Sequence, residues 1–389
     1  MTFGSVVGAV THHVGPALDA VVAHSGTTHA GTPHWVLGTL TLVGVVAALG
    51  GWALLRDEDT STRFGVGLVS VGILATIAGA ISLVDIQIAP QTTPEWTRWF
   101  PVINAVASIL VALGSLVVVR LKWPERPRYV GLGFLLAAWI AYPTMMPNEG
   151  LSHPFGYLLA FAVPVAVGYV LSRDGGDGLS RPVGAESGRL PAAFASRLSK
   201  AVAAVAFALF GVFFAFSAGT ISVNPDVTAE MAGDGFVTTH SVASPLVYWP
   251  AIEFYVPSVP LSGYVSVGTV VLAGLLGGLV ALNAGLVARQ WESGGAADSP
   301  RAMVGTVAAS GATACCCCAP ALYGAVGVLF GAAAAPVYWA FLDPTSPVGG
   351  LFFAASVLVL AGSALRTSHD PACAVPRESD SGAVSEQTA

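Results

Sequence analysis

The sequence predicts an all-α integral membrane protein, a polytopic bundle of about nine transmembrane helices with the N-terminus outside and the C-terminus in the cytoplasm. Three observations predict this fold class: the composition, the length of the apolar segments and the distribution of the basic residues. Of 389 residues, 54% are hydrophobic and 10% are charged, and the mean hydropathy is +0.72. A chain this apolar does not stay dissolved as a globule, so we expect a multi-pass protein of the cell membrane.

Apolar segments of about 20 residues recur along almost the whole chain, the length that crosses a hydrocarbon core of ~30 Å at ~1.5 Å per residue. They are long and do not alternate between apolar and polar residues, so they predict helices rather than the strands of a barrel. The predicted spans are 35–55, 64–84, 101–119, 129–146, 155–171, 201–219, 263–288, 302–331 and 348–365.

The basic residues predict the orientation. With nine spans, fifteen of the sixteen lysines and arginines fall on one side of the membrane, and Arg98 falls on the other. Loops in the cytoplasm carry the excess of basic residues, which assigns the basic side to the cytoplasm. The first ten residues carry no charge, so we expect no cleaved signal peptide.

Composition shifts predict five regions. The linker is rich in Gly, Ser and Arg, the first region combines an amphipathic pattern with a His-rich turn segment, and the tail is polar and expected to be disordered. The regions are an extracytoplasmic segment 1–34, a five-helix half 35–171, a cytoplasmic linker 172–200, a four-helix half 201–365 and a cytoplasmic tail 366–389.

The second half contains the longest outer segment, residues 220–262, which we expect to be a loop. It holds no lysine or arginine. Its aromatic residues favour a belt at the membrane interface; they are Tyr248, Trp249, Phe254 and Tyr255.

Several kinds of function are disfavoured. No Asp, Glu, Lys or Arg lies in the middle of a predicted span, which disfavours a proton-coupled pump because intramembrane charges are costly. The chain also lacks the GxxxxGK[ST], GxSxG and HExxH motifs. These absences favour a protein that is not an enzyme without deciding the question, and we expect no nucleic-acid partner. The glycine pairs Gly274 with Gly278 and Gly327 with Gly331 predict close helix packing.

Four of the five cysteines are consecutive, Cys315, Cys316, Cys317 and Cys318, and Pro320 follows them. On a regular helix only Cys315 and Cys318 share a face. Pro320 donates no hydrogen bond and its ring clashes with the carbonyl of Cys316, so the helix is expected to break there, with a second half-helix beginning at the proline.

The segment 302–331 is too long for one straight span, which also favours a broken helix. Counting from Arg301 at ~1.5 Å per residue places Cys315 about 21 Å from the cytoplasmic edge, in the outer half. An alternative turns the chain at the cysteines and gives ten spans, which would place Arg366 and Arg377 outside.

The run Cys316-Cys317-x-x-Pro320, with Ala325 and Gly327 after it, resembles the first span of the mercuric-ion transport membrane proteins. The resemblance covers about 20 residues. It implies that Cys316 and Cys317 receive a thiophilic cation from outside. This chain is far longer than that family, adds Cys315 and Cys318, and lacks the second cytoplasmic pair, for which Cys373 is the one remaining cysteine. Cu(I), which also prefers thiolates, is therefore as good a candidate as Hg(II).

A simpler interpretation of the cysteine run remains open. Cysteine is a small apolar residue, and among Ala, Gly, Ser and Thr it can serve tight helix packing alone.

Histidines give a second candidate site. His24, His29 and His34 recur at five-residue intervals in a predicted outer turn segment. Neutral imidazole is a ligand for copper and zinc, so these residues are candidates for a capture site that feeds the cysteines. The alternative is that they are ordinary polar loop residues.

These patterns predict a membrane protein that binds or transports a thiophilic transition-metal ion, Cu(I) or Hg(II). A copper or other soft metal ion is the expected cofactor, and the expected partners are the lipid bilayer and a membrane metalloenzyme or metal carrier. One alternative is a non-transporting accessory or assembly subunit of a membrane metalloenzyme. A second is a membrane thiol oxidoreductase, which is ranked last because neighbouring cysteines form a strained ring.

Overall fold

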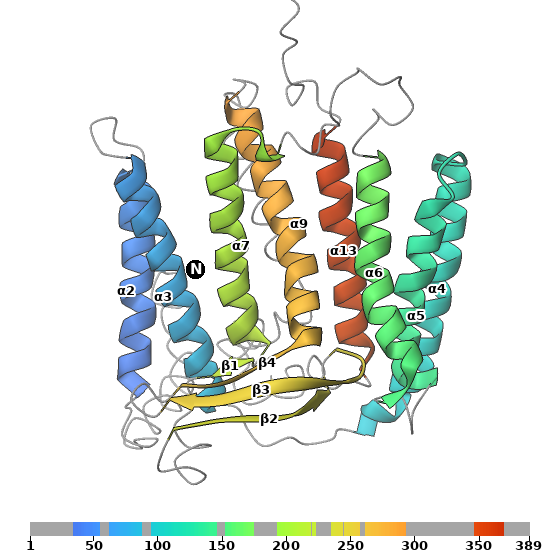
Figure 1. Cartoon of the computed structure of the whole chain (residues 1–389), viewed down its shortest axis with the longest axis horizontal. Helices are drawn as coiled ribbons and strands as arrows, with labels where there is room; N and C mark the ends of the chain where they lie inside the picture. The colour runs from blue at the N-terminus through green and yellow to red at the C-terminus, as the bar shows by residue number, and fades with distance from the viewer. Residues whose placement is uncertain are drawn as a thin grey trace, which may run out of the picture.

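Upright helices stand side by side in the computed structural model, and a small β-sheet lies across one end of them (Figure 1). The structure describes residues 34–54, 62–87, 95–145, 152–174, 193–218, 220–222, 235–243, 245–256, 261–292 and 346–368. We call the end that carries the sheet the sheet end and the opposite end the far end.

The described helices match eight of the nine predicted spans in position, and the ninth, 302–331, lies outside the described residues. The helices are α2 (His34–Leu54), α3 (Thr62–Gln87), α4 (Phe100–Lys122), α5 (Arg128–Met145), α6 (Pro154–Asp174), α7 (Arg197–Ser217), α9 (Val267–Glu292) and α13 (Pro347–Ser368), with a 3-10 turn η1 (Glu95–Trp99) before α4.

Six of these helices are long and apolar enough to cross a membrane: α2, α4, α6, α7, α9 and α13. The chain is therefore mostly helical in its described part and has the character of a multi-pass membrane protein. The count of nine spans and the orientation stay predictions. The N-terminal residues 1–33 and the tail residues 369–389 lie outside the described part.

The predicted outer loop contains a four-stranded antiparallel sheet, which the sequence reading missed. Its strands are β1 (Ile221–Ser222), β2 (Phe236–Ala243), β3 (Tyr248–Val256) and β4 (Leu261–Ser266), in the spatial order β1-β4-β3-β2. β4 also takes the first residues of the predicted span 263–288 and runs directly into α9 at Val267.

Strand β3 explains why the aromatic belt was a wrong interpretation for part of this segment. Its first residues alternate, with Trp249 and Ala251 buried and Tyr248 and Ile252 exposed, as expected for a strand with one covered face. Pro250 is tolerated because the pairing of β3 with β4 begins only at the next residue, so its missing N–H leaves no gap on that side.

Trp249 links the sheet to α6. Its indole Nε1 donates to the carbonyl of Pro245 at 2.9 Å. Its ring meets Tyr157 and Phe161 of α6 edge to face, with centroids 4.9 and 5.7 Å apart. The hydroxyl of Tyr157 in turn donates to the carbonyl of Tyr248. The residue expected at the lipid interface is thus part of the protein core.

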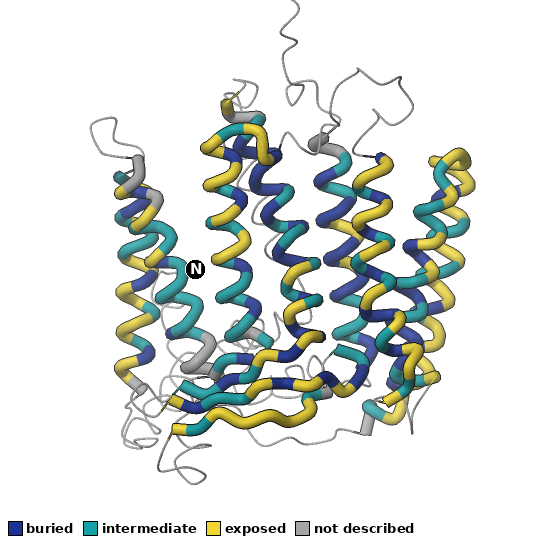
Figure 2. The backbone as a smooth tube through the Cα atoms, viewed as in Figure 1, coloured by how far each residue is buried: buried dark blue, intermediate teal, exposed yellow. Residues whose placement is uncertain are grey.

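One hydrophobic cluster joins α5, α6, α7, α9 and α13, and it includes residues from both sides of the predicted linker 172–200. The stacked rings of Trp139 and Phe353, 4.2 Å apart, lie within it. Burial is concentrated in these central helices, whereas α2 and α4 carry many exposed residues (Figure 2).

Helices α2 and α3 pair through small residues. A Cβ added at Gly72 of α3 would lie 2.4 Å from the backbone nitrogen of Ala48, and one added at Gly44 of α2 would lie 2.5 Å from that of Thr76. The two backbones therefore touch, and no side chain fits between them at these levels.

The predicted glycine contacts in α9 are not found among the described residues. No described atom lies within 4 Å of a Cβ built at Gly274 or Gly278, whereas Gly277 between them faces Phe207 and Phe210 of α7. The second predicted pair, Gly327 and Gly331, lies outside the described residues.

Candidate functional site

Most of the predicted metal ligands lie outside the described residues. These are His24, His29, Cys315, Cys316, Cys317 and Cys318. His34 is the first residue of α2, at the sheet end. The described part of the chain therefore shows the helices on either side of the cysteine segment, not the cysteines.

The helices that flank the cysteine segment, α9 and α13, run in the same direction. Phe353 of α13 lies level with Leu272 of α9, and both line one pocket near the sheet end. Leu360 lies level with Asn283, which donates to its carbonyl. Both helices therefore progress from the sheet end to the far end (Figure 1). The described α9 thus ends at the far end, and α13 begins at the sheet end.

Asn283 is a buried polar residue that the sequence reading missed, with 4% of its surface exposed. Its Nδ2 donates to the carbonyl of Leu279 at 2.8 Å and to that of Leu360 at 2.9 Å. Its Oδ1 is buried and has no hydrogen-bond partner among the described residues. The signal in the sequence was an amide inside an otherwise apolar span, where such residues usually bond to another helix.

The far half of α9 is surrounded by protein. Seven of the eight residues from 281 to 288 are buried, and successive residues on a helix point about 100° apart. No side of this stretch therefore faces lipid broadly. Among the described elements, α7 and then α13 make the most extensive contacts with α9.

The two described histidines outside the helices do not form a metal site. The Nδ1 atom of His240 on β2 lies 3.4 Å from Oε2 of Glu253 on β3, and both side chains are about 40% exposed. The Nδ1 atom of His153 accepts the backbone N–H of Phe155 at 3.2 Å. Within the described ranges, no group of three or more His, Cys, Asp or Glu residues could hold a metal ion.

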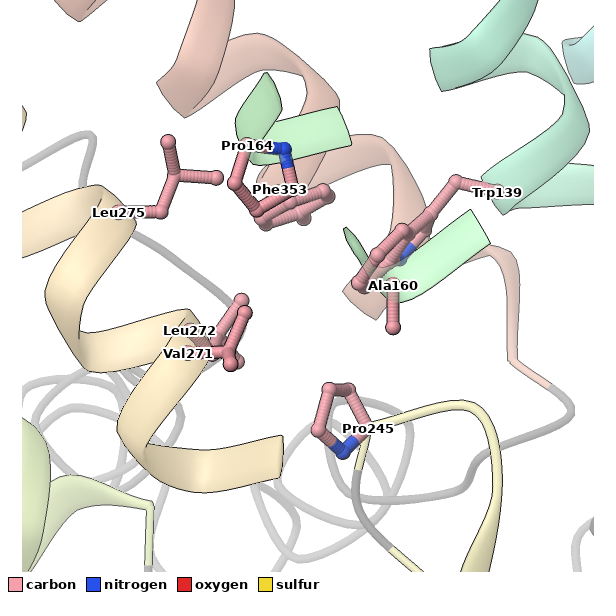
Figure 3. A pocket seen from close by; sticks show the side chains of 8 residues that line it. All are labelled: Trp139, Ala160, Pro164, Pro245, Val271, Leu272, Leu275 and Phe353. Atoms are coloured by element: carbon pink, nitrogen blue, oxygen red, sulfur yellow. The ribbon is translucent and has the colours of Figure 1, made fainter. Parts of the chain in front are cut away.

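A pocket between the central helices is apolar. It is lined by Trp139 of α5, Ala160 and Pro164 of α6, Val271, Leu272 and Leu275 of α9, Phe353 of α13 and Pro245 (Figure 3). The lining holds no carboxylate, imidazole or thiol, so this pocket does not suit a metal ion.

Comparisons with protein-family models, with curated proteins and with solved structures gave no match for this chain.

Proposed function

We propose that this protein binds or transports a thiophilic transition-metal ion, Cu(I) or Hg(II), through Cys315, Cys316, Cys317 and Cys318. The observation that carries the proposal is the sequence itself: four of five cysteines are consecutive, in an apolar segment that a proline follows two residues later. Thiolates select soft cations, and a proline-broken helix is the usual way to present polar groups inside a membrane.

The directions of α9 and α13 support this proposal. Because α9 ends at the far end and α13 begins at the sheet end, the residues between them join opposite ends of the bundle. One crossing that contains the cysteines agrees with this path. Two spans with a turn at the cysteines would bring the chain back to the far end, whereas α13 begins at the sheet end. The ten-span alternative is therefore disfavoured.

The test is metal binding by the full chain, purified without oxygen. We expect about one Cu(I) per chain, and loss of that metal when Cys315 to Cys318 are all replaced by serine, because a hydroxyl is a poor ligand for a soft ion. The matched control is Cys373→Ser, which removes the remaining cysteine and should leave the metal content unchanged. Equal metal content in the four-serine variant and the parent chain would refute the proposal.

An accessory role without transport is a second candidate, and the sheet favours it. The face of the sheet turned away from Trp249 carries Val237, Ile252 and Val265, which are 75, 54 and 51% exposed. Exposed apolar surface of this kind often contacts a partner protein, here a membrane metalloenzyme or a metal carrier. Metal flux into proteoliposomes distinguishes the roles, since binding without flux indicates hand-over to a partner.

A further inference from the structure

Five basic side chains gather where α4, α5 and α6 meet at the far end. They are Arg120, Lys122, Arg126, Arg128 and Arg173, and two carboxylates, Glu125 and Asp174, lie among them. We call this group the basic corner. Arg120 and Lys122 are in the last turn of α4, Arg128 begins α5, and Arg173 and Asp174 end α6.

The carboxylate of Asp174 pairs with two arginines of the basic corner. Its side chain is 1% exposed, and it accepts from Nε of Arg128 at 2.7 Å and from Nη2 of the same residue. Nη1 of Arg126 lies 3.6 Å from the same carboxylate. This paired geometry ties the start of α5 to the end of α6, and it balances the charge of one arginine.

Within the described structure, no ion pair links the remaining basic residues to a carboxylate. Among the described residues, Arg120, Lys122 and Arg173 make no ion pair, and all three are exposed. The guanidinium of Arg173 lies 5.6 Å from the ring centroid of Tyr169. The corner therefore presents positive charge that nothing in the described structure neutralises.

Exposed apolar side chains next to these charges give the corner the composition typical of a membrane–water interface. Leu121 is 78% exposed and Trp123 is 43% exposed. The Trp123 ring also meets Tyr129 edge to face, with centroids 5.6 Å apart. Tryptophan and tyrosine prefer the level of the lipid headgroups, and lysine and arginine extend from a helix end toward the same level.

We propose that the basic corner binds the phosphate headgroup of an anionic phospholipid. Arg120 and Lys122 supply positive charge that no described carboxylate pairs with. Arg126 is already held by Asp174 and by the Tyr129 hydroxyl at 3.4 Å, so its side chain loses little further freedom when the lipid binds. Leu121 and Trp123 lie where the first carbons of the acyl chains would contact the protein. Basic groups between helix ends are typical sites for such lipids. The site is independent of the proposed metal function.

The experiment uses the full chain, reconstituted in vesicles of phosphatidylglycerol and phosphatidylcholine and then extracted in mild detergent, with the retained lipids counted by mass spectrometry. We expect phosphatidylglycerol to be enriched over its share in the vesicle. Arg120→Gln combined with Lys122→Gln should reduce that enrichment on the order of 10- to 30-fold. The reason is that each basic residue near a membrane surface adds a comparable amount to the binding free energy of an anionic lipid.

Two single variants sharpen the test. Glu125→Gln removes an exposed carboxylate from the corner and should raise the enrichment. Arg98→Gln is the matched control: Arg98 also lies near a tryptophan, 5.8 Å from the Trp99 ring, but at the other end of α4, and should leave the enrichment unchanged.

The proposal is overturned if phosphatidylglycerol is not enriched, or if the double variant behaves like Arg98→Gln. Loss of the bound lipid on addition of inorganic phosphate would identify a free-phosphate site instead and would also overturn it.

Discussion

Helices α2 and α3 are held together in a different way from the central helices α5, α6, α9 and α13. In the α2–α3 pair, glycines bring the two backbones into contact, and the large side chains of α2, such as Leu42 and Val46, point outward. In the central bundle many large side chains point inward, and rings such as Trp139 and Phe353 fill the space between helices.

The difference shows two solutions to one physical problem. Lipid tails are as apolar as leucine, so burying a large side chain between helices gains little from the hydrophobic effect inside a membrane. Helices associate there through close van der Waals contact. Contact between backbones achieves this in α2–α3, and interdigitated side chains achieve it in the centre. The two regions should therefore respond in opposite ways to changes of side-chain size.

The largest effect is expected from enlarging a residue in the α2–α3 pair. Gly72→Leu places a side chain where the backbone of Ala48 already lies, so the helices must separate, at a cost of about 3 kcal/mol. Thermal unfolding in detergent and disulfide cross-linking between engineered cysteines on α2 and α3 would measure it. Gly67→Leu, also in α3, is the matched control, because no described atom lies within 4 Å of a Cβ built at Gly67. Equal behaviour of the two variants would contradict backbone contact.

A smaller effect is expected from truncating a residue in the central bundle. Phe353→Ala leaves a cavity beside Trp139 and removes the stacked ring. Its cost should be about 2 kcal/mol, below the ~3–5 kcal/mol typical of water-soluble cores, because in lipid the transfer term is largely absent. Leu358→Ala, on the exposed side of α13, serves as the control and should change the melting temperature little. A larger loss from Leu358→Ala than from Phe353→Ala would show that the assignment of the inner face is wrong.

The smallest effect is expected at Asn283, the polar contact within the apolar bundle. Asn283→Leu removes the hydrogen bond from α9 to Leu360 of α13, and hydrogen bonds between membrane helices contribute about 0.6 kcal/mol on average. The unfolding free energy should fall by about that amount, whereas Gly278→Ala, which adds a methyl group in open space, should leave it unchanged. A loss several times larger would mean that the unpaired Oδ1 of Asn283 has a partner outside the described residues.

Much of the helical fold could be predicted from the sequence, because hydropathy depends on each residue's own chemistry. The eight described helices begin and end within a few residues of the predicted spans, with α9 the main exception. Its first predicted residues, 263–266, form β4, since an apolar run of this length does not by itself distinguish a strand from a helix.

Packing could not be predicted in the same way, because it depends on which helix lies opposite. Gly274 and Gly278 have the same four-residue spacing as many contact motifs, yet no described atom lies within 4 Å of a Cβ built at either position. The glycines at which the backbones of α2 and α3 touch are seven residues apart, at Gly72 and Gly79 in α3 and at Gly44 and Gly51 in α2. The burial of Trp249 likewise required Tyr157 and Phe161, about 90 residues earlier in the chain.

The candidate metal site was derived from residue types and spacing alone, and the cysteines lie outside the described residues. The structure adds the directions of the two flanking helices, which local sequence does not contain. Asn283 could have been noted as the amide of an apolar span, but its partner at Leu360 could not, because the two residues are 77 positions apart.

The 77 positions between Asn283 and Leu360 also determine when their hydrogen bond can form during synthesis of the chain. At ~5–20 residues per second, a ribosome that has just added Asn283 needs about 4–15 s to reach Leu360. Between residues 292 and 347, α9 is complete while α13, its parallel neighbour, has not yet begun. Until Leu360 is made, the Asn283 amide has only Leu279 of its two described acceptors, so the contact of α9 with α13 forms after α9 itself is complete.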